Sequence, residues 1–289
     1  MSGLRLREEL VSVPIYDRVA PPRDEQLREE NNVLRALPPT DYARVFAHLE
    51  PIEAENRRVI WEPYATIREV WFPRSCVVSI VNVMKTGGTV EAATTGCEGI
   101  VGLPLALGCS NSSTRAIVQV PGRAARMSAA AFVDLLAQSM PLRALAFRIM
   151  NALFEQTAQT AACNRLHSVE QRCARWLLMT AERARSNEYP LTQEFLAQML
   201  GVRRAGVTVV AGELQRAHLI SYRRGHVTVL DRDGLEKVSC ECFRVVQERY
   251  DGLRSDGVRA DGRGDGRTDG RTDCRTDGRG DGRGDGRGL

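Results

Sequence analysis

The stretch LTQEFLAQMLGVRRAGVTVVAGELQRAHLISYRRGHVTV, residues 191–229, decides the fold of this chain. Thr192 can cap a first short helix, and this helix has an apolar face. That face comprises Leu196, Met199 and Leu200. Ala197 is small enough for a second helix to approach closely, and Gly201 permits the left-handed turn that a tight helix-to-helix connection requires. The pattern predicts a helix-turn-helix.

The second helix of this motif is expected directly after the turn. Apolar residues recur on one face, namely Val207, Val210, Ala211 and Leu214. The other face carries Arg204, Ala205, Thr208, Gly212 and Arg216. The four β-branched residues 207–210 and two glycines favour a strand by local propensity. We nevertheless expect a helix, because the residues sort onto two helical faces and tertiary packing can outweigh propensity.

Two short β-rich runs, 219–222 and 227–230, flank Arg223-Arg224-Gly225-His226 and predict a two-stranded wing with a basic tip. Residues 203–226 contain five Arg and one Glu, and their balance of +4 equals the formal net charge of the whole chain. Such a concentration of cations predicts an anionic partner whose phosphates supply most of the affinity. A helix-turn-helix with this charge predicts binding in the major groove of double-stranded DNA.

The composition is that of a soluble globular protein. The chain has 289 residues, of which 43% are hydrophobic and 26% charged, a size typical of roughly two domains. No apolar run reaches the ~18 residues of a membrane span, and the N-terminus lacks a secretory signal, so we expect a cytoplasmic protein. The eight cysteines form no C-x-x-C pair and are expected to be core residues, with no metal site.

The C-terminal segment 254–289 consists mainly of Asp-Gly-Arg repeats. Because apolar residues are nearly absent and glycine is frequent, we expect this tail to be disordered. Arg/Gly segments can bind RNA weakly. The alternating Asp residues screen the arginines, however, and favour a neutral tail.

The N-terminal half combines two helices with several strands. The helices are expected over 25–37 and 41–49, the second capped by Thr40 or Asp41. The strands are expected over 58–61, 69–72, 76–84, 89–95 and 115–120. A hairpin turn at 86–88 joins the third and fourth strands. Short strands punctuated by Gly and Pro predict an antiparallel barrel or roll.

A long helix is expected to begin at Pro141. Its recurring face comprises Leu142, Leu145, Ile149, Ala152, Gln156, Gln159, Cys163 and Leu166. This face either packs on the helix's own domain or forms a homodimer seam. We favour the seam, because a helix of ~25 residues that links two compact halves has little else to bury against.

Three parts of the chain carry a resemblance to a known family: Glu170-Gln171-Arg172-Cys173-Ala174-Arg175-Trp176-Leu177-Leu178, residues 191–216 and the wing. They resemble the Crp/Fnr superfamily of bacterial transcription regulators, and the similarity extends over residues 27–245. The resemblance implies an α+β protein with an N-terminal double-stranded antiparallel β-roll, a long dimerisation helix and a C-terminal winged helix-turn-helix. It implies a homodimer on palindromic DNA, with RNA polymerase as a further partner. The implied organisation is an N-terminal extension (1–26), a cyclic-nucleotide-binding-like sensory roll (27–140), the dimerisation helix (141–167), the winged helix-turn-helix domain (168–253) and the tail (254–289).

The resemblance assigns DNA-contacting roles to residues that match family positions. Thr192 and Gln193 match phosphate-contacting positions, and Arg204 matches a base-reading arginine suited to guanine O6 and N7. Ala205 stands where many members have Glu, and Val209 where some have Arg, so the target sequence does not follow from those of the better-known members. We expect Arg203, Arg204 and Thr208 to carry specificity. The full predicted interface is Thr192, Gln193, Arg203, Arg204, Ala205, Thr208, Val209, Arg216, Arg223, Arg224 and His226.

Residues 96–104, GCEGIVGLP, resemble the phosphate cassette of the family's sensory roll. The candidate effector-binding residues are Glu98, Gly99, Gly102, Leu103 and Arg115. A cyclic nucleotide needs an acid for its ribose and an Arg for its phosphate. It is disfavoured, because Leu103 occupies the acid position and Arg115 lies about one residue out of register, although Glu98 could substitute.

Other cofactors are disfavoured as well, so the effector is left open. An iron–sulfur cluster would need cysteines near the N-terminus, and the first cysteine here is Cys76. Haem would need an axial histidine, and only His48 and His167 lie outside the DNA-binding half. A redox role for Cys240 and Cys242 is conceivable, but packing on a helix after the wing is the favoured explanation.

No catalytic triad, metal-ligand spacing or phosphate-binding loop is present, so we predict that the protein is not an enzyme. The alternative function is a ligand- or protein-binding regulatory module whose winged helix contacts RNA or protein. The favoured mechanism is a population shift in which a signal in the roll repositions two recognition helices on half-sites ~34 Å apart. The expected hinge is His167–Ser168, where Ser168 and Gln171 can form a capping box.

Overall fold

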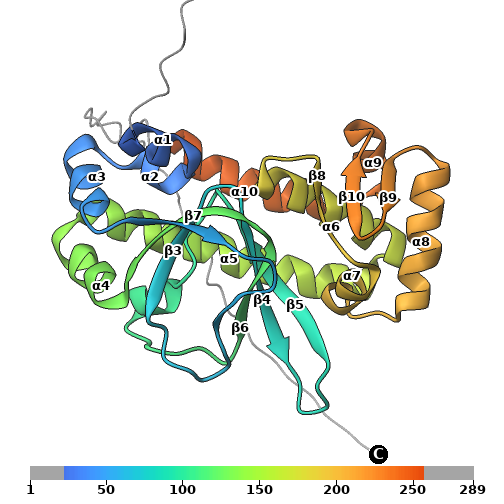
Figure 1. Cartoon of the computed structure of the whole chain (residues 1–289), viewed down its shortest axis with the longest axis horizontal. Helices are drawn as coiled ribbons and strands as arrows, with labels where there is room; N and C mark the ends of the chain where they lie inside the picture. The colour runs from blue at the N-terminus through green and yellow to red at the C-terminus, as the bar shows by residue number, and fades with distance from the viewer. Residues whose placement is uncertain (1–22, 257–289) are drawn as a thin grey trace, which may run out of the picture.

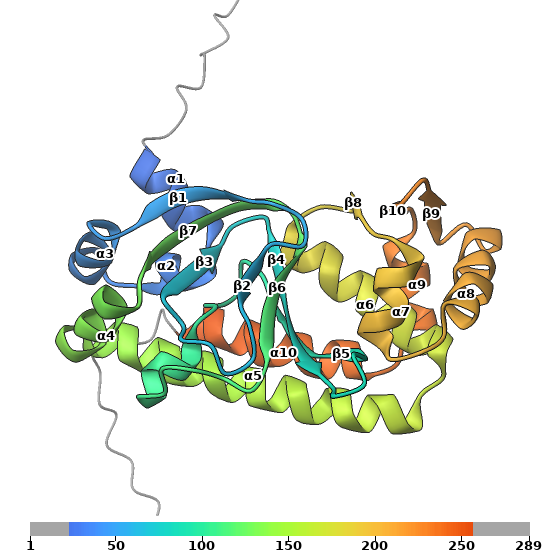
Figure 2. The ribbon, with the colours of Figure 1, turned by 60° about the horizontal axis from the view of Figure 1, so that its bottom comes forward.

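The computed structural model describes residues 23–256 (Figure 1). The predicted N-terminal extension and the predicted tail lie outside the described residues, apart from 23–26, which begin the first helix, and 254–256, which end the last. A β-roll and a smaller, mainly helical part lie side by side, and one long helix, α5 (Met140–Leu166), runs along both of them (Figure 2).

The chain enters the roll through three short helices, α1 (Arg23–Glu30), α2 (Asn32–Ala36) and α3 (Pro39–Phe46). The single helix predicted over 25–37 is interrupted at Asn31, because the side chain of this residue caps α2 by accepting hydrogen bonds from the amides of Val33 and Leu34, at 3.0 and 3.2 Å. The predicted cap at Thr40 or Asp41 is wrong, since α3 begins at Pro39 and has no side-chain cap.

The roll consists of two antiparallel sheets. One sheet has the order β1-β7-β3 and the other β2-β6-β4-β5. Their strands are β1 (Glu50–Ala54), β2 (Val59–Trp61), β3 (Glu69–Pro73), β4 (Val77–Val83), β5 (Thr89–Thr95), β6 (Arg115–Val120) and β7 (Gly122–Ser128). The five predicted strands and the hairpin are confirmed. The prediction missed β1 and β7, whose sequences EPIEA and GRAARMS contain few β-branched or aromatic residues.

One short helix precedes the last two strands of the roll, β6 and β7, and another follows them. The short 3-10 helix η1 (Leu103–Leu107) lies between β5 and β6, and α4 (Ala129–Gln138) follows β7. Ser139 then caps α5, because its hydroxyl accepts a hydrogen bond from the Leu142 amide at 3.1 Å, and Pro141 occupies the first turn. Within residues 23–256, no single helix is both long enough and apolar enough to cross a bilayer; α4 and α5 meet that test only as a pair, which is bent by 113°.

Most of the face of α5 that was predicted to form the homodimer seam is buried inside the chain instead; of its eight residues, Gln159 is half-buried and Leu166 is exposed. Its buried residues are Leu142, Leu145, Ala146, Ile149, Ala152, Gln156 and Cys163. Gln156 explains why this face contains polar residues: its amide donates to the Thr94 carbonyl and accepts from Arg183 and Tyr250. The predicted position of the seam is therefore wrong, because the roll and the last helix, α10 (Cys242–Asp256), already cover most of this face.

The opposite face of α5 is exposed and carries large apolar side chains. Phe147 is 46% exposed and Phe154 is 72% exposed. They belong to a stripe that advances alternately by four and three residues, which we call the exposed stripe: Met140, Ala144, Phe147, Asn151, Phe154, Ala158 and Ala161. This spacing is the one found along the contact line of two-stranded coiled coils.

The second part of the chain begins with α6 (Val169–Ala184), which has the predicted capping box between Ser168 and Gln171. Its remaining elements are β8 (Glu188–Pro190), α7 (Gln193–Leu200), α8 (Arg204–Arg216), β9 (Ile220–Arg223), β10 (His226–Val229) and α9 (Arg232–Val238), before α10. The wing was predicted to be two-stranded. It has three strands in the order β8-β10-β9, because the extended link before α7 pairs with β10.

The two parts are joined by buried polar contacts between α6 and the roll. The Trp176 indole donates to Glu91 at 3.0 Å, and Gln119 donates to Thr180 at 2.9 Å. Where β5 ends, Gly96 lies so close to Arg183 that a Cβ atom at this glycine would be 2.4 Å from the Arg183 Cβ. Backbone therefore packs on backbone at this point, and only glycine fits.

Burial raises the pKa of Glu91 to about 7. The hydroxyl of Ser79 lies within hydrogen-bond distance of both Glu91 and Gln119, at 2.7 and 2.6 Å, and it has only one proton for these two acceptors. A neutral Glu91 can donate to Ser79, which leaves Ser79 free to donate to Gln119. The protonated form thus completes a chain of hydrogen bonds that runs from Glu91 to Thr180.

We expect the free energy of unfolding to fall as the pH rises from 4.5 to 7, because the folded protein holds the Glu91 proton more tightly than the unfolded chain does. The whole effect is on the order of 3 kcal/mol at most. Glu91→Gln should remove this part of the pH dependence in urea titrations followed by circular dichroism. The control Glu55→Gln, at an exposed site, should keep it. An unchanged pH profile in Glu91→Gln would contradict the assignment.

Candidate nucleic-acid interface

The turn between α7 and α8 has the geometry predicted from the sequence. Thr192 caps α7 by accepting a hydrogen bond from the Phe195 amide at 3.2 Å. Gly201 ends the helix in the left-handed region with φ +63°, and the amide of Val202 closes the turn on the Ala197 carbonyl at 3.0 Å. The helix-turn-helix is therefore fixed by local hydrogen bonds and a glycine.

Helix α8 presents two chemically different faces. Its buried residues are Val207, Val210, Ala211 and Leu214, as predicted. Arg203, which precedes the helix, provides no side-chain cap. The first turn of α8 therefore combines backbone amides that lack helical partners with two exposed arginines, Arg203 and Arg204, which is a favourable environment for an anion.

The outer face of α8 is partly ordered by contacts with α7. The Thr208 hydroxyl donates to Gln193 at 2.7 Å, so two residues predicted independently to contact DNA touch one another. Val209 is 59% exposed, which is unusual for an apolar side chain on a helix with a well-packed inner face. An exposed methyl-bearing residue of this kind can contact a thymine methyl group.

The wing has a tight turn at Arg224 and Gly225, which both have positive φ angles of 48° and 79°. These two residues join the paired residues Arg223 and His226, as expected for a two-residue hairpin loop. The wing is held against the start of α7, because the Tyr222 hydroxyl donates to the Leu191 carbonyl at 2.9 Å. Burial raises the pKa of Tyr222 to about 12, so this hydroxyl keeps its proton.

The structure brings the predicted DNA-contacting residues onto one part of the surface formed by α7, α8 and the wing. All except Gln193, which is half-buried, are exposed: Thr192, Arg203, Arg204, Ala205, Thr208, Val209, Arg216, Arg223, Arg224 and His226. One contact was not expected from the sequence. Arg57 of the roll donates to the Thr192 hydroxyl at 3.3 Å and lies over the Phe195 ring, so the roll reaches the start of α7.

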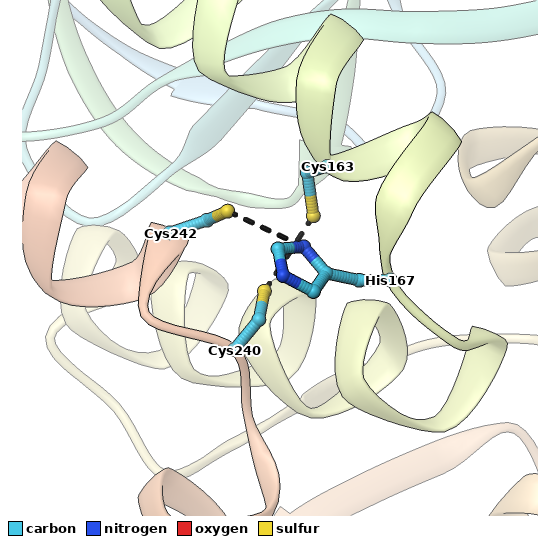
Figure 3. A group of neighbouring side chains, drawn as sticks. All are labelled: Cys163, His167, Cys240 and Cys242. Carbon is cyan, nitrogen blue, oxygen red and sulfur yellow. Dashed lines mark hydrogen bonds between the residues drawn. The ribbon is translucent and has the colours of Figure 1, made fainter.

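Three cysteines and a histidine, which were not predicted to lie together, form a cluster at the base of this domain (Figure 3). Cys163, His167, Cys240 and Cys242 offer one ligand atom each, and these four atoms lie within 4.8 Å of one another. Cys240 was expected on a helix, but it lies in the link between α9 and α10. The signals that could have revealed the cluster are the C-x₃-H spacing at the end of α5 and the C-x-C spacing after α9.

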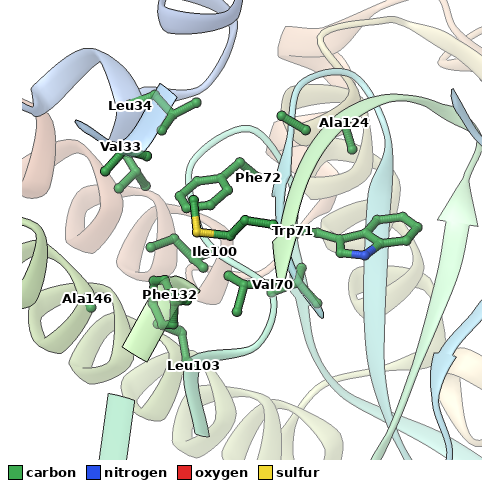
Figure 4. Close-up of a cluster of buried hydrophobic side chains, with 14 of the residues drawn as sticks. Val33, Leu34, Val70, Trp71, Phe72, Ile100, Leu103, Ala124, Phe132 and Ala146 are labelled. Atoms are coloured by element: carbon green, nitrogen blue, oxygen red, sulfur yellow. The ribbon is translucent and has the colours of Figure 1, made fainter. Parts of the chain in front are cut away.

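The candidate effector residues do not form one site. Leu103 is buried in the core of the roll among the side chains of Ile100 and Phe132 (Figure 4). Gly99 is also buried, and Gly102 has a φ of +116° with no room for a side chain beside Val70. Arg115 forms an ion pair with Glu62 at 2.7 Å. In this arrangement neither Arg115 nor Leu103 offers a group to a ligand's phosphate or ribose.

Glu98 faces the second part of the chain. Its carboxylate accepts a hydrogen bond from Arg183 at 2.7 Å, and both side chains are nearly buried. These two residues line a cavity of about 480 Å³ between the end of β5, α6 and α10, together with Arg185 and Tyr250. This cavity lies at the boundary of the roll and the DNA-binding part, and Cys97 and Glu98 are the residues of the predicted cassette that line it.

Residues 171–238 match the Crp-like helix-turn-helix domain. No curated protein sequence matches the chain. Among solved structures, a putative transcriptional regulator of the Crp/Fnr family from Eubacterium rectale is similar, with 16% identity over 71% of this chain and 96% of that chain, and a TM-score of 0.53. FixK2 from Bradyrhizobium japonicum has 11% identity, 66% and 98% coverage and a TM-score of 0.57.

A CRP-family transcriptional regulator from Thermus thermophilus is similar as well, with 17% identity, 66% and 96% coverage and a TM-score of 0.54. The helix-turn-helix and the wing thus belong to a Crp-like DNA-binding domain. With its roll and its long helix, the chain has a fold similar to that of these Crp/Fnr-type transcription regulators, and the α+β fold class predicted from the sequence is confirmed.

Gly201→Ala should lower the free energy of unfolding by about 1–2 kcal/mol, because alanine is disfavoured in the left-handed region. The new Cβ atom would also lie 3.2 Å from the Val90 side chain. Gly212→Ala is the matched control, since nothing lies within 4 Å of its Cβ position in α8 and it should gain up to about 1 kcal/mol. Thermal unfolding of both variants measures the difference, and equal stabilities would refute the turn geometry.

Proposed function

We propose that the protein is a homodimeric transcription regulator that binds a palindromic DNA operator through α8 and the wing. The observation that carries this proposal is the outer face of α8, where Arg203, Arg204, Thr208 and Val209 are exposed together on a helix whose inner face is packed. A helix of this kind fits the major groove, where arginine can bind guanine bidentately. The cytoplasm, where bacterial operators are found, is its expected location.

The residues of this surface divide into two roles. Arg203, Arg204 and Thr208 lie at the N-terminal end of the recognition helix, so we assign base recognition to them. Thr192 and Gln193 at the start of α7, Arg216, and the wing residues Arg223, Arg224 and His226 lie around this helix and are assigned to phosphate. Phosphate contacts position the protein, whereas base contacts supply the specificity.

We place the dimer contact on the exposed stripe of α5. Its alternating spacing of four and three residues suits a parallel pair of helices, and Phe147 and Phe154 would be removed from water there. A two-fold axis along α5 would present two recognition helices to half-sites one helical turn apart, about 34 Å. RNA polymerase is the further partner that such a regulator needs to affect transcription.

We further propose that a signal acts through the boundary between the roll and α6. His167 and Ser168 both have extended backbone angles, with ψ near 151° and 159°, so the chain breaks its helix between α5 and α6 at the predicted hinge. Contacts of Glu91 with Trp176 and of Glu98 with Arg183 connect that hinged helix to the roll. A ligand that changed these contacts would shift the population of DNA-binding orientations. The effector itself is not assigned.

The first test is selection of binding sites from random duplex DNA, followed by fluorescence anisotropy with the selected sequence. Arg204→Ala should weaken binding to this sequence about 10- to 100-fold while random DNA is little affected, because a bidentate contact with guanine is lost. The control Arg224→Ala should weaken both DNAs similarly and lower the salt slope by about 1. Equal losses on both DNAs for Arg204→Ala would refute base recognition.

The same selection separates the main proposal from its alternative. Enrichment of a palindrome with two half-sites supports the dimeric regulator. A lack of preference for any duplex sequence, together with binding to RNA or protein, would favour a regulatory module instead.

Phe154→Glu should convert the dimer into a monomer, because it places a charge in the proposed contact between the two α5 helices. The expected dissociation constant of the dimer rises by at least about tenfold, as a charge buried without a partner costs more than 1.4 kcal/mol. Val133→Glu in α4 is the control, since Val133 is an exposed apolar residue outside the stripe. Analytical ultracentrifugation measures both. A stable dimer in Phe154→Glu would place the contact elsewhere.

A further inference from the structure

The cysteine–histidine cluster joins two segments that are distant in sequence. Cys163 and His167 lie at the end of α5, one turn apart on the same side of the helix, whereas Cys240 and Cys242 lie between α9 and the start of α10 (Figure 3). The Crp-like domain, residues 171–238, lies entirely between these two pairs. A shared ligand held by both pairs would therefore connect the two ends of the DNA-binding domain.

The distances within the cluster suit one tetrahedral metal ion. With zinc–sulfur bonds of about 2.3 Å and zinc–nitrogen bonds of about 2.0 Å, two sulfur ligands lie about 3.8 Å apart, and a sulfur and a nitrogen about 3.5 Å apart. The Sγ atoms of Cys163 and Cys240 are 3.5 Å apart, and the Sγ atom of Cys242 is 3.5 Å from Nδ1 of His167. Small side-chain adjustments therefore suffice to surround an ion.

The same distances argue against an iron–sulfur cluster. The protein ligands of such a cluster are divided between two or four iron atoms that bridging sulfides separate, so ligand atoms on different irons are spread more widely than those around one ion. Here all four ligand atoms lie within 4.8 Å of one another. The set of three thiols and one imidazole is a common ligand set of structural zinc sites.

The neighbouring side chains support the ligand geometry. Nε2 of His167 lies 3.3 Å from the carboxylate of Glu241, so this carboxylate can hold the proton on Nε2 and leave Nδ1 free to bind a metal. The amide of Gln159 donates to the Sγ atom of Cys242 at 3.0 Å, which stabilises a thiolate. A carboxylate behind the imidazole and a donor to the sulfur are typical second-layer partners of zinc sites.

The charge around the cluster is also suitable. Three thiolates and one divalent zinc ion carry a net charge of −1. Arg172 and Arg175 lie close enough to interact electrostatically with the Cys163 thiol, and the side chain of Arg175 is buried. The Nε atoms of both arginines are buried without a hydrogen-bond partner. Buried positive charge of this kind compensates a negatively charged metal–thiolate centre.

We propose that Cys163, His167, Cys240 and Cys242 bind one zinc ion in a four-coordinate structural site that fixes the DNA-binding domain to the end of α5. The three cysteines are buried and His167 is half-buried, so the four protein ligands complete the coordination and leave no open position for catalysis. The ion connects α5 to α10 directly beside the break at His167–Ser168. It thus limits the motion of the proposed hinge.

The first test uses the full-length wild-type protein, purified under reducing conditions and dialysed against metal-free buffer. We expect one zinc ion per chain by elemental analysis. Replacing the zinc with Co²⁺ should give the intense visible absorption of a tetrahedral site and a sulfur-to-cobalt charge-transfer band. A chain without retained zinc, a weak octahedral cobalt spectrum, or a Cys163–Cys240 disulfide in place of the metal would overturn the proposal.

The second test uses single variants. Cys240→Ser and His167→Ala should each lower zinc affinity at least about tenfold in competition with a chromophoric chelator, and Glu241→Gln should lower it less. Cys173→Ala and Cys109→Ser are controls, because one is buried in α6 and the other is exposed, and neither belongs to the cluster. They should retain one zinc ion. Circular dichroism of each variant reports whether it is folded.

This inference can fail separately from the proposed function, since zinc content and cobalt spectra are measured without DNA. Equal zinc affinity of Cys240→Ser and wild type would refute the site even if the protein binds an operator. A zinc-binding protein without operator preference would leave the site intact and refute the proposed function. Hydrogen exchange at residues 163–170 should be slower with zinc than after its removal by a chelator.

Discussion

The structure depends on the burial of one face of α5. This helix of 27 residues is long enough to serve both parts of the chain, and its apolar residues near the start, such as Leu142 and Leu145, belong to the core of the roll. Farther along the helix, the side chain of Gln156 forms hydrogen bonds with residues of β5, α6 and α10. Because a buried amide is costly unless it is fully hydrogen-bonded, this residue holds three elements in one arrangement. Helix α5 therefore fixes the position of the roll relative to the DNA-binding part.

The helix-turn-helix could be predicted from sequence because its signals are local. The cap at Thr192, the glycine at the turn and the spacing of Val207, Val210 and Leu214 act within a few residues of one another. The strands β1 and β7 could not be predicted in this way. Their residues have low strand propensity, and they form strands because β7 pairs with β1 on one side and with β3 on the other.

The long helix shows a different limit of sequence analysis. Periodicity identified an apolar face, but it does not distinguish a face that packs inside the chain from one that packs on a partner. The face with Leu142 and Ile149 is the more hydrophobic, and it is covered by the roll. The exposed stripe contains Ala144 and Asn151 as well as Phe154, so it is less hydrophobic than the buried face. It can be recognised only when the exposure of its side chains is known.

The cysteine–histidine cluster was missed because its two halves are separated by the whole Crp-like domain, and neither spacing is diagnostic alone. The candidate effector residues were chosen from a resemblance within the roll, but the structure buries Leu103 and pairs Glu98 with Arg183 of α6. The side chain of Glu98 thus serves the boundary between the two parts. The cavity that Glu98 lines with Arg183 lies at this boundary, whereas Leu103 of the same cassette is buried in the core of the roll.

The close approach of Gly96 to Arg183 also limits how this boundary can move. With no side chain on the glycine, the end of β5 and the backbone of α6 touch directly, and the Cys97 amide reaches the Arg183 carbonyl at 3.5 Å. Flexible side chains can change conformation when a helix slides, whereas two backbones in direct contact cannot slide past one another without a steric clash. If α6 tilts, the end of β5 must therefore move with it, or the contact between the end of β5 and α6 must be lost.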